Sequence, residues 1–582
     1  MKKYIIVTIA LLTILNASAQ TNYYVDAISG NDLNNGTSLG TAWKTIQKAC
    51  NTATPNSIVQ IKGGTYNENV VVNVNGTIGN PITFKNYMND IVLIDGASTS
   101  GSTMITITNK NYLIFQNFTI QNKTINDAQG LLVETTASNT STSLTFKNIT
   151  IKNINWTSSI TAIPTPTDNA QGFIAYGRNG GITNLTVDSC QIFNNILGFS
   201  EALAINGNVD GFVVKNCKVH TNTNIGIDII GHEGTCSIVA LDEARNGFVS
   251  NNECYNNVSA YATSGGIYVD GSKNVTIEKN KCYENGWGIE VGAELNGTVE
   301  QITVKNNLIF NNQQAGLSIG GYDPTTTGQV INSVVRNNTF FQNNSLNDGT
   351  GEISMTKASN CVFENNVFYT NSQDVFMSVD NISPQAGNVF NYNCWFTPSN
   401  DPNNITVNWI TSTYSTFSAY QAGTTQETNS IYSNPSLNNS ILPTPNLHLQ
   451  TGSTCIDAGN PATIISIGET DFDGNVRING STIDIGGFEF NSALGINNVV
   501  INNSSFLVYP NPFIFETTIS FNSELKNAKF KIYNILGQGI KEVENIYGRQ
   551  ITINRDNLTE GIYFYKFTKD NKVIAVGKLI AE

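Results

Sequence analysis

Short runs of apolar residues, separated by polar residues, Gly and Asn, follow one another along most of the chain, and one such phrase recurs. Nine apolar residues hold the same place in it, at intervals of 31, 41, 27, 35, 28, 27, 31 and 28: Ile120, Ile151, Ile192, Val219, Cys254, Cys282, Ile309, Phe340 and Phe368. A period of roughly 20 to 50 residues indicates one supersecondary unit stacked many times. The runs are short or alternate with polar residues, which predicts strands rather than helices.

The repeat favours an all-β solenoid, a right-handed parallel β-helix. A leucine-rich horseshoe needs a dense leucine framework and usually a helical stretch, and these units have neither. Successive coils of a β-helix lie roughly 4.8 Å apart, so equivalent residues form ladders. The right hand is expected from the general handedness of parallel crossovers. One corner asparagine per coil is predicted to hydrogen-bond along its ladder: Asn222, Asn257, Asn285, Asn312, Asn343 and Asn371.

The start of the chain has the three regions of a secretory signal peptide. Two lysines come first, then an apolar run over residues 4–15, then Ala-Ser-Ala at residues 17–19. Residues 1–19 are therefore predicted to be a signal peptide. Because no later segment reaches 18 apolar residues, the mature protein is expected to be exported, through the periplasm, without a membrane span.

Composition narrows the classes of partner. The chain has 582 residues, of which 40% are apolar and 13% charged, and its formal net charge is −13. This length and apolar content predict a large core and more than one domain. The negative charge argues against binding to nucleic acid or to anionic membranes. The nine cysteines, an odd number, are expected to be mainly buried thiols that replace aliphatic residues.

The β-helix is predicted to occupy residues 20–395. Near its start, a strand, a Gly/Asn-rich loop and a helix around Trp43, Ile46 and Ala49 are expected to cap the open end of the solenoid. Residues 23–95 resemble the beginning of the β-helix in secreted carbohydrate-active proteins of the pectate-lyase-like superfamily, which includes pectate lyases and several glycoside hydrolases. The resemblance implies this fold and, as an expectation, action on a polysaccharide.

Two further segments follow. Residues 396–492 are predicted to end the β-helix as a terminal module, whose aspartates are expected to cap turns rather than bind calcium. Residues 503–582 contain evenly spaced short strands, typical of a small β-sandwich. The phrases YPNP, IYNILGQ, GIYFYKF and GKLI closely resemble the C-terminal sorting domain of the type IX secretion system of Bacteroidota. That resemblance implies the type IX machinery as a partner, and secretion or attachment at the outer cell surface.

Candidate chemistry lies on the strands that begin with Gly and an apolar residue, at Gly226, Gly266, Gly288 and Gly316. Because successive side chains of a strand point to opposite faces, one residue of each strand is expected to point away from the core, and together these residues form a column: Asp228, Tyr268, Glu290 and Ser318. The next column contains Ile230, Asp270, Gly292 and Gly320. Asp228 and Asp270, like Asp270 and Glu290, are diagonal neighbours about 8 Å apart. Paired carboxylates about 6.5 to 9.5 Å apart suit inverting glycoside hydrolysis.

Other residues near this patch are candidates for binding or proton transfer. His232, four residues after Asp228 in the enlarged coil between Val219 and Cys254, is a candidate proton shuttle or substrate contact. Three aromatic residues are expected to stack on sugar faces, namely Tyr268, Trp287 and Tyr322. Arg245 and Lys273 are candidate substrate contacts, and candidate bases if the reaction is an elimination.

These residues predict a secreted enzyme that cleaves glycosidic bonds of a polysaccharide, with hydrolysis by paired carboxylates as the preferred reaction. One alternative is a calcium-dependent polysaccharide lyase, in which Asp228, Asp270 and Glu290 hold the metal. Calcium is the one cofactor that the sequence raises, and it belongs to this alternative. The other alternative is a non-catalytic glycan-binding or adhesin solenoid, for which the fold alone is sufficient.

Overall fold

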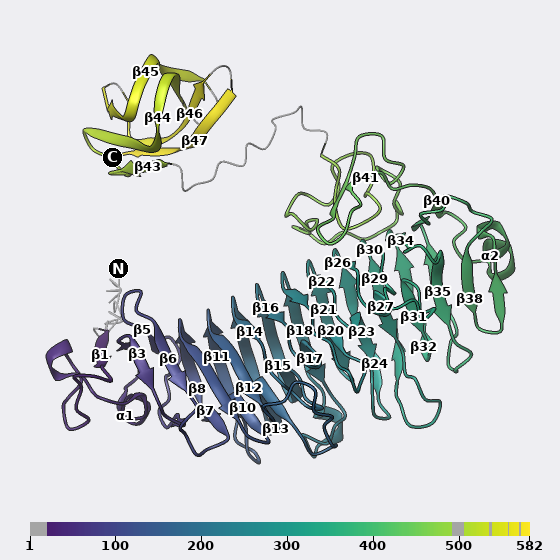
Figure 1. The fold of residues 1–582 in the computed structure, drawn as a ribbon, viewed down its shortest axis with the longest axis horizontal. Helices are drawn as coiled ribbons and strands as arrows, with labels where there is room; N and C mark the ends of the chain where they lie inside the picture. Colours follow the sequence, from purple (N-terminus) through teal and green to yellow (C-terminus); the bar gives the residue numbers. More distant parts are fainter. Residues whose placement is uncertain (1–19, 492–505, 535–537, 557, 570–571) are drawn as a thin grey trace, which may run out of the picture. The chain divides into compact units, whose positions relative to one another are not determined.

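The computed structural model describes residues 20–491, 506–534, 538–556, 558–569 and 572–582, shown in Figure 1. The predicted signal peptide, residues 1–19, lies outside the described residues. The chain divides into two compact units, residues 1–490 and 491–582. Each unit is described by itself.

The first unit is a parallel β-helix with three strands in a typical coil, as the repeat predicts. One face of the solenoid carries the candidate residues of the sequence analysis and is called the site face. Its strands are β4 (Val70–Val71), β7 (Thr103–Thr108), β10 (Ala128–Glu134), the first parts of β13 (Ala170–Asp188) and β15 (Leu203–Lys215), β17 (Ile227–Ile230), β20 (Gly265–Asp270), β23 (Trp287–Gly292), β27 (Leu317–Ile319), β31 (Ile353–Met355), β35 (Val375–Val379) and β38 (Thr406–Trp409). The last of these, β38, also pairs with the antiparallel β39 (Ser412–Tyr414).

The second face follows after a short corner. It contains β1 (Thr21–Val25), β2 (Ser57–Ile61), β5 (Ile82–Asn86), β8 (Asn111–Gln116), β11 (Ser141–Lys147), the second parts of β13 and β15, β18 (Arg245–Ser250), β21 (Lys273–Glu278), β25 (Thr303–Lys305), β29 (Val334–Arg336), β33 (Val362–Glu364) and β36 (Val389–Asn391), with the short β24 (Thr298–Glu300), β28 (Gln329–Ile331) and β32 (Ala358–Ser359) beside them.

The third face completes each coil as a separate parallel sheet. Its strands are β3 (Gly64–Tyr66), β6 (Val92–Asp95), β9 (Thr119–Thr124), β12 (Thr150–Asn155), β14 (Gln191–Phe193), β16 (Lys218–His220), β19 (Glu253–Tyr255), β22 (Lys281–Tyr283), β26 (Leu308–Phe310), β30 (Thr339–Phe341), β34 (Val367–Tyr369), β37 (Cys394–Phe396) and β40 (Ile431–Tyr432). The nine residues that mark the sequence repeat lie on this sheet, each paired with the next in register.

The predicted cap is present at the start of the solenoid. It consists of the 3-10 helix η1 (Leu39–Thr41) and the helix α1 (Ile46–Thr52), which begins where the Thr45 side chain accepts a hydrogen bond from the Lys48 amide. Ile46 and Ala49 of this helix are buried in the main core cluster, together with Trp43 just before it. The helix therefore closes an apolar cross-section that the first coil would otherwise expose.

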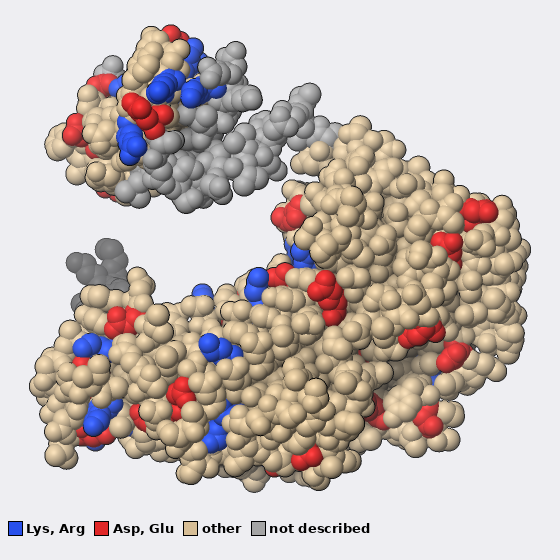
Figure 2. All heavy atoms as spheres, viewed as in Figure 1, with Lys and Arg blue, Asp and Glu red and all other residues tan. Residues whose placement is uncertain are grey.

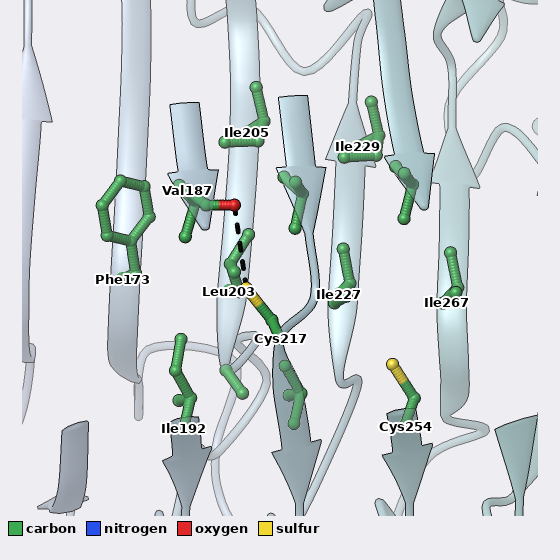
Figure 3. Close-up of a cluster of buried hydrophobic side chains, with 14 of the residues drawn as sticks. Phe173, Val187, Ile192, Leu203, Ile205, Cys217, Ile227, Ile229, Cys254 and Ile267 are labelled. Atoms are coloured by element: carbon green, nitrogen blue, oxygen red, sulfur yellow. Dashed lines mark hydrogen bonds between the residues drawn. The ribbon is translucent and has the colours of Figure 1, made fainter. Parts of the chain in front are cut away.

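Period-two alternation places the apolar residues of all three faces inside the solenoid (Figure 3). Ile227, Ile267, Ile289 and Leu317, the residues predicted to point inward, are fully buried. All nine cysteines are buried and none forms a disulfide, which confirms the prediction of buried thiols. Cys254 and Cys282 are partners in register, and Figure 3 shows the Cys217 thiol directed toward the Val187 carbonyl oxygen, 3.7 Å away.

Two buried asparagine ladders run along the corners of the coils. The first joins Asn195, Asn222, Asn257, Asn285, Asn312 and Asn343, and the second joins Asn252, Asn280, Asn307, Asn338, Asn366 and Asn393. In each step an Asn Nδ2 donates to the Oδ1 of the next Asn, over 2.8 to 3.1 Å. The predicted ladder is thus present, and the sequence analysis missed the second.

Each ladder ends at a buried glutamate. One residue that was predicted to belong to the first ladder is therefore wrong. Asn371 does not continue the first ladder, because its Nδ2 donates to the carbonyl oxygens of Asn343 and Asn344. The Glu352 carboxylate accepts the terminal Asn343 side chain instead. In the second ladder, the Glu427 carboxylate accepts the Asn393 side chain. Burial raises the pKa of Glu352 to about 8 and that of Glu427 to about 7.

Residues 396–490 belong to the same compact unit as the coils. Their regular elements are β38, β39, α2 (Phe417–Thr424), β40, β41 (Leu437–Asn439) and β42 (Asn446–Leu449). Apolar residues of this segment, such as Leu447 and Phe488, pack in one cluster with Phe310 and Phe341 of the third face. Asp457 and Asp471 accept backbone N–H groups in turns, which agrees with the prediction of turn-capping aspartates.

The second unit is all-β, as predicted, and its strands are antiparallel. Its strands are β43 (Phe506–Tyr509), β44 (Glu516–Tyr533), β45 (Gly539–Asn554), β46 (Gly561–Lys569) and β47 (Lys572–Ala581). They hydrogen-bond in one five-stranded sheet rather than in two separate sheets, because the long β44 pairs with β43, β45 and β46. Ile519, Phe530 and Phe567 are buried in its own core.

Charge is sparse on the molecular surface. Figure 2 shows large areas of one face without a Lys, Arg, Asp or Glu side chain, as expected from 13% charged residues. In the described parts of the chain, no helix is long and apolar enough to cross a membrane.

We predict that interrupting a ladder destabilises the β-helix unit. In Asn280→Ala, the amide and side-chain donors of Asn252 lose a buried acceptor, so the free energy of unfolding should fall by about 2–4 kcal/mol. All five tryptophans lie in this unit, so tryptophan fluorescence during denaturant unfolding reports it selectively. Asn403→Ala, at an exposed loop position, is the control, and equal midpoints for the two variants would contradict the prediction.

Candidate active site

The predicted column of outward residues is present on the site face. Asp228 pairs with Tyr268, Tyr268 with Glu290, and Glu290 with Ser318. In the neighbouring column, Ile230 pairs with Asp270. The sheet therefore places Asp228, Asp270 and Glu290 on three neighbouring strands, in the register that the Gly-apolar phrase indicates.

The patch is buried under loops rather than open to solvent, which corrects the expectation of an exposed sheet. Asp228 is 2% exposed, Asp270 5% and Tyr268 7%. Residues from the segments before and after the site-face strands, such as Glu201 and Thr263, line two pockets together with these buried side chains. Burial changes the chemistry of these side chains, because a carboxyl group removed from water resists ionisation.

The first of these pockets, here called the acidic pocket, has a volume of about 390 Å³. Its lining contains five carboxyl groups, those of Glu201, Asp228, Glu233, Asp270 and Glu294. No Lys or Arg of the described chain lines it. The sequence analysis selected Asp228 and Asp270 of these five residues and missed Glu201.

All five carboxyl groups have raised pKa values. For Asp228 the main cause is burial, followed by the charge of Asp270 and then that of Glu201. For Asp270 the main cause is again burial, followed by the charge of Glu294, although its Oδ1 accepts the Glu294 amide at 2.8 Å. Burial raises the pKa of Glu201 to about 8, and the Glu294 charge adds to this. Glu201 therefore retains its proton near neutral pH, and the other four carboxyl groups ionise less readily than exposed ones do.

Several buried polar atoms of the acidic pocket have no hydrogen-bond partner among the described residues: Asn206 Oδ1, Asn224 Oδ1 and Asp228 Oδ1. A buried acceptor without a donor costs free energy, and native structures rarely leave one without a reason. The three atoms belong to two successive coils, since Asn206 lies on β15, Asp228 lies on the neighbouring β17, and Asn224 precedes β17. They suit a ligand rich in hydrogen-bond donors.

The second pocket, here called the aromatic pocket, has a volume of about 420 Å³ and shares Thr263 with the acidic pocket. Its lining includes Tyr268, Trp287, Glu290 and Tyr322. The buried Trp287 Nε1 has no partner among the described residues. Tyr322 is 75% exposed, so its ring forms part of the rim.

Glycines leave room for the side chains of the column. A Cβ atom at Gly265 would lie 2.8 Å from Glu290 Oε1, so the Glu290 carboxyl group leans back over the preceding coil. A Cβ atom at Gly292 would lie 3.6 Å from the Tyr268 hydroxyl, so that hydroxyl leans toward the following coil. Burial, and then the charge of Glu294, raise the pKa of Glu290 to about 8.

Three predicted residues lie apart from both pockets. Arg245 and Lys273 pair with each other on the second face, where they form ion pairs with Asp210 and Glu300. His232 directly follows the strand of Asp228, but its ring packs against Gly297 and Gly271. Neither pocket is lined by any of the three.

The residues proposed for calcium do not converge. Asp228 and Asp270 line the acidic pocket, whereas Glu290 lines the aromatic pocket. Across the described residues, no group of three or more His, Cys, Asp and Glu side chains has an arrangement that holds a metal ion. The donor set of the calcium alternative therefore does not fit in this structure.

Extending the strand alignment one coil upstream does not identify Glu201, because Ala204 is the residue of that coil in the column of Asp228. Phe173 of β13 pairs with Leu203 of β15, so Gln171 and Glu201, each two residues earlier, occupy equivalent positions. Glu201 was missed because it precedes β15, outside the strand positions that the recurring phrase defines.

Comparison with known sequences agrees with this architecture. The family described as a right-handed β-helix region matches residues 139–340, and the secretion system C-terminal sorting domain matches residues 507–582. The uncharacterized protein YwoF of Bacillus subtilis (strain 168) is 32% identical over 433 residues, which cover 72% of this chain and 89% of that protein. The chain belongs to the YwoF family.

Solved structures that are similar to this YwoF-family chain include two carbohydrate-active enzymes and one surface adhesin. Pectate lyase Pel9A is 19% identical, with a TM-score of 0.43, over 81% of this chain and 97% of that one. The GH136 lacto-N-biosidase of Eubacterium ramulus is 13% identical, with a TM-score of 0.40, over 65% and 64%. The surface adhesin PfbA of Streptococcus pneumoniae is 13% identical, with a TM-score of 0.38, over 58% and 82%.

The matched C-terminal domain confirms the predicted route of the chain. It marks this member of the YwoF family for the type IX secretion machinery and for the cell surface or the exterior. The site on the β-helix is therefore expected to meet extracellular ligands.

We predict that neutralising Glu290 stabilises the β-helix unit in a pH-dependent way. The unfolded carboxyl group ionises near its ordinary pKa of 4.5 and the folded one near 8, so the native protein loses stability as pH rises through this window. Gln does not titrate. The melting temperature of Glu290→Gln, followed by tryptophan fluorescence, should match that of the native protein at pH 4 and exceed it by roughly 2–4 °C at pH 8.

Proposed function

We propose that this protein is an exported enzyme that hydrolyses glycosidic bonds of an extracellular glycan, with Asp228 as the general acid and Asp270 as the general base. The observation that carries the proposal is the pair of buried carboxyl groups at the floor of a pocket, one of them with an unpartnered oxygen. A non-catalytic glycan-binding solenoid gives no reason to bury ionisable groups at this cost.

Asp228 has the properties of a proton donor. Burial and neighbouring carboxyl groups raise its pKa, so it remains protonated at a pH at which an exposed aspartate is ionised. Asp228 lines the acidic pocket, and its Oδ1 has no partner among the described residues. A protonated carboxyl group in this position can donate to the oxygen of a glycosidic bond.

Asp270 is the better proton acceptor of the two. Its Oδ1 accepts the backbone N–H of Glu294 at 2.8 Å, an interaction that favours the ionised form. Because the two groups repel each other's negative charge, the pair tends to hold one proton, and the hydrogen bonds favour Asp228 as its position. Asp270 is then free to accept a proton from water.

The reaction balances with these two groups. Asp228 gives its proton to the leaving oxygen as the bond between that oxygen and the anomeric carbon breaks. A water molecule forms the new bond to the anomeric carbon and gives a proton to Asp270. The Cα atoms of the pair are diagonal neighbours about 8 Å apart, which suits the inverting arrangement with water between carboxylate and sugar.

The aromatic pocket supports binding of the next sugar along the chain. Trp287 and Tyr322 offer aromatic surface, and the unpartnered Trp287 Nε1 offers a donor to a sugar oxygen. Because the two pockets share Thr263, an oligosaccharide can extend from one into the other. Glu290 and Tyr268 lie between these parts of the site.

Hydrolysis is favoured over calcium-dependent elimination by the side chains of the pockets. Elimination needs a base that removes a carbon-bound proton next to a uronate carboxylate, and Arg245 and Lys273 are engaged elsewhere in ion pairs. A uronate would also meet the five carboxyl groups of the acidic pocket without a basic side chain to receive it.

We predict that Asp228→Asn and Asp270→Asn fold normally and lose activity by about 10²-fold or more. The assay incubates the full chain with a panel of plant, algal and microbial polysaccharides and records new reducing ends together with the ultraviolet absorbance of unsaturated chain ends. Asp210→Asn makes the same change outside both pockets and is the matched control. New reducing ends without absorbance are expected. Full activity in both pocket variants would refute the assignment, and rising absorbance would establish elimination.

A further inference from the structure

Three carboxyl groups of the acidic pocket have no part in the proposed hydrolysis. They belong to Glu201, which precedes β15, Glu233, which follows β17, and Glu294, which follows β23. They form the wall of the pocket, whereas Asp228 and Asp270 belong to the strands of its floor.

The wall carboxyl groups lie close enough to repel one another. The charge of Glu294 is the largest electrostatic contribution to the raised pKa of Glu201 and of Glu233, and the charge of Glu233 also raises the pKa of Glu201. Because no Lys or Arg of the described chain lines the pocket, this repulsion has no internal counter-charge. A cation brought by a ligand would relieve it.

Two buried amides provide a second and independent indication of a ligand. Asn206 is 8% exposed and Asn224 is 3% exposed, both residues line the acidic pocket, and their Oδ1 atoms have no donor among the described residues. Asn224 Nδ2 donates to the Gly198 carbonyl oxygen at 3.3 Å, which fixes its Oδ1 as the free acceptor. The pocket thus presents amide oxygens together with carboxyl groups, and a cation bound beside these carboxyl groups would favour their ionised, hydrogen-bond-accepting form.

A protonated amine matches this set better than a neutral hydroxyl group does. An ammonium group carries a positive charge and three donors, whereas a hydroxyl group carries one donor and no charge. A divalent cation is less well matched, since no three acidic or histidine side chains of the described chain converge on one point.

We propose that the acidic pocket binds a sugar unit that carries a free amino group, held by Glu201, Glu233 and Glu294 together with the two asparagine oxygens. This inference rests on the proposed function, because it specifies the substrate class of the same site. The substrate is then a glycan that contains non-acetylated hexosamine, and its ammonium group supplies the counter-charge that the pocket lacks.

The test measures binding by calorimetry to the full chain carrying Asp228→Asn, which prevents turnover. The probes are tetrasaccharides of glucosamine and of galactosamine, their N-acetylated forms, and neutral tetrasaccharides of glucose and of galactose. At least one free-amine probe should bind tenfold or more tightly than both its N-acetylated and its neutral counterparts. Adding Glu201→Gln should reduce this preference to twofold or less without weakening the neutral probe. Glu300→Gln, outside the pocket, is the matched control and should leave the preference unchanged.

The alternative outcomes separate the inference from the proposed function. If no free-amine probe is preferred, the inference fails, and it fails also if calcium chloride alone binds in a Glu201-dependent manner. In either case, Asp228-dependent cleavage of a neutral glycan would still support the proposed hydrolase function. If the preference for the amine depends on Glu201 but the native protein cleaves none of the probes, the inference of an amine-binding pocket is supported and the proposed hydrolase function is refuted.

Discussion

The hydrogen bonds between stacked asparagines set the register on which the site depends. Each ladder amide donates to the next coil and accepts from the previous one, so one missing residue would shift every later strand relative to its neighbour. Register decides which side chains share a column, and a shift of one residue would direct Asp228 into the core. The carboxyl group at the end of each ladder supplies the acceptor that the last asparagine needs.

The ladders also explain how the fold tolerates a costly site. Burial of several carboxyl groups in one pocket opposes folding, and a small domain could not offset it easily. Here many coils share one continuous apolar core, and each adds its own strand and ladder hydrogen bonds. The rigid sheet then holds Asp228, Tyr268, Asp270 and Glu290 in fixed relative positions, while residues that precede or follow the strands form the walls of the acidic pocket.

The sequence predicted the parts of the structure that obey periodic rules. The period of the repeat predicted the solenoid, and the two-residue alternation along each strand predicted the column of Asp228, Tyr268 and Glu290. Burial of that column could not be predicted, because it depends on loops whose paths no period describes. For the same reason Glu201 was missed, and Arg245 and Lys273 were expected near a site from which a corner separates them. The predicted end of the first ladder was wrong because the side chain that accepts from Asn343 is Glu352, in the loop before β31, and not Asn371.

The measurement that tests the account most directly is a crystal structure of the Asp228→Asn variant with a bound oligosaccharide. The account predicts a sugar chain that extends from the acidic pocket into the aromatic pocket. A glycosidic oxygen should lie within hydrogen-bond distance of the residue 228 side chain, and a water held by Asp270 should lie on the opposite side of the anomeric carbon. An oligosaccharide bound elsewhere on the solenoid, with both pockets empty, would contradict the account.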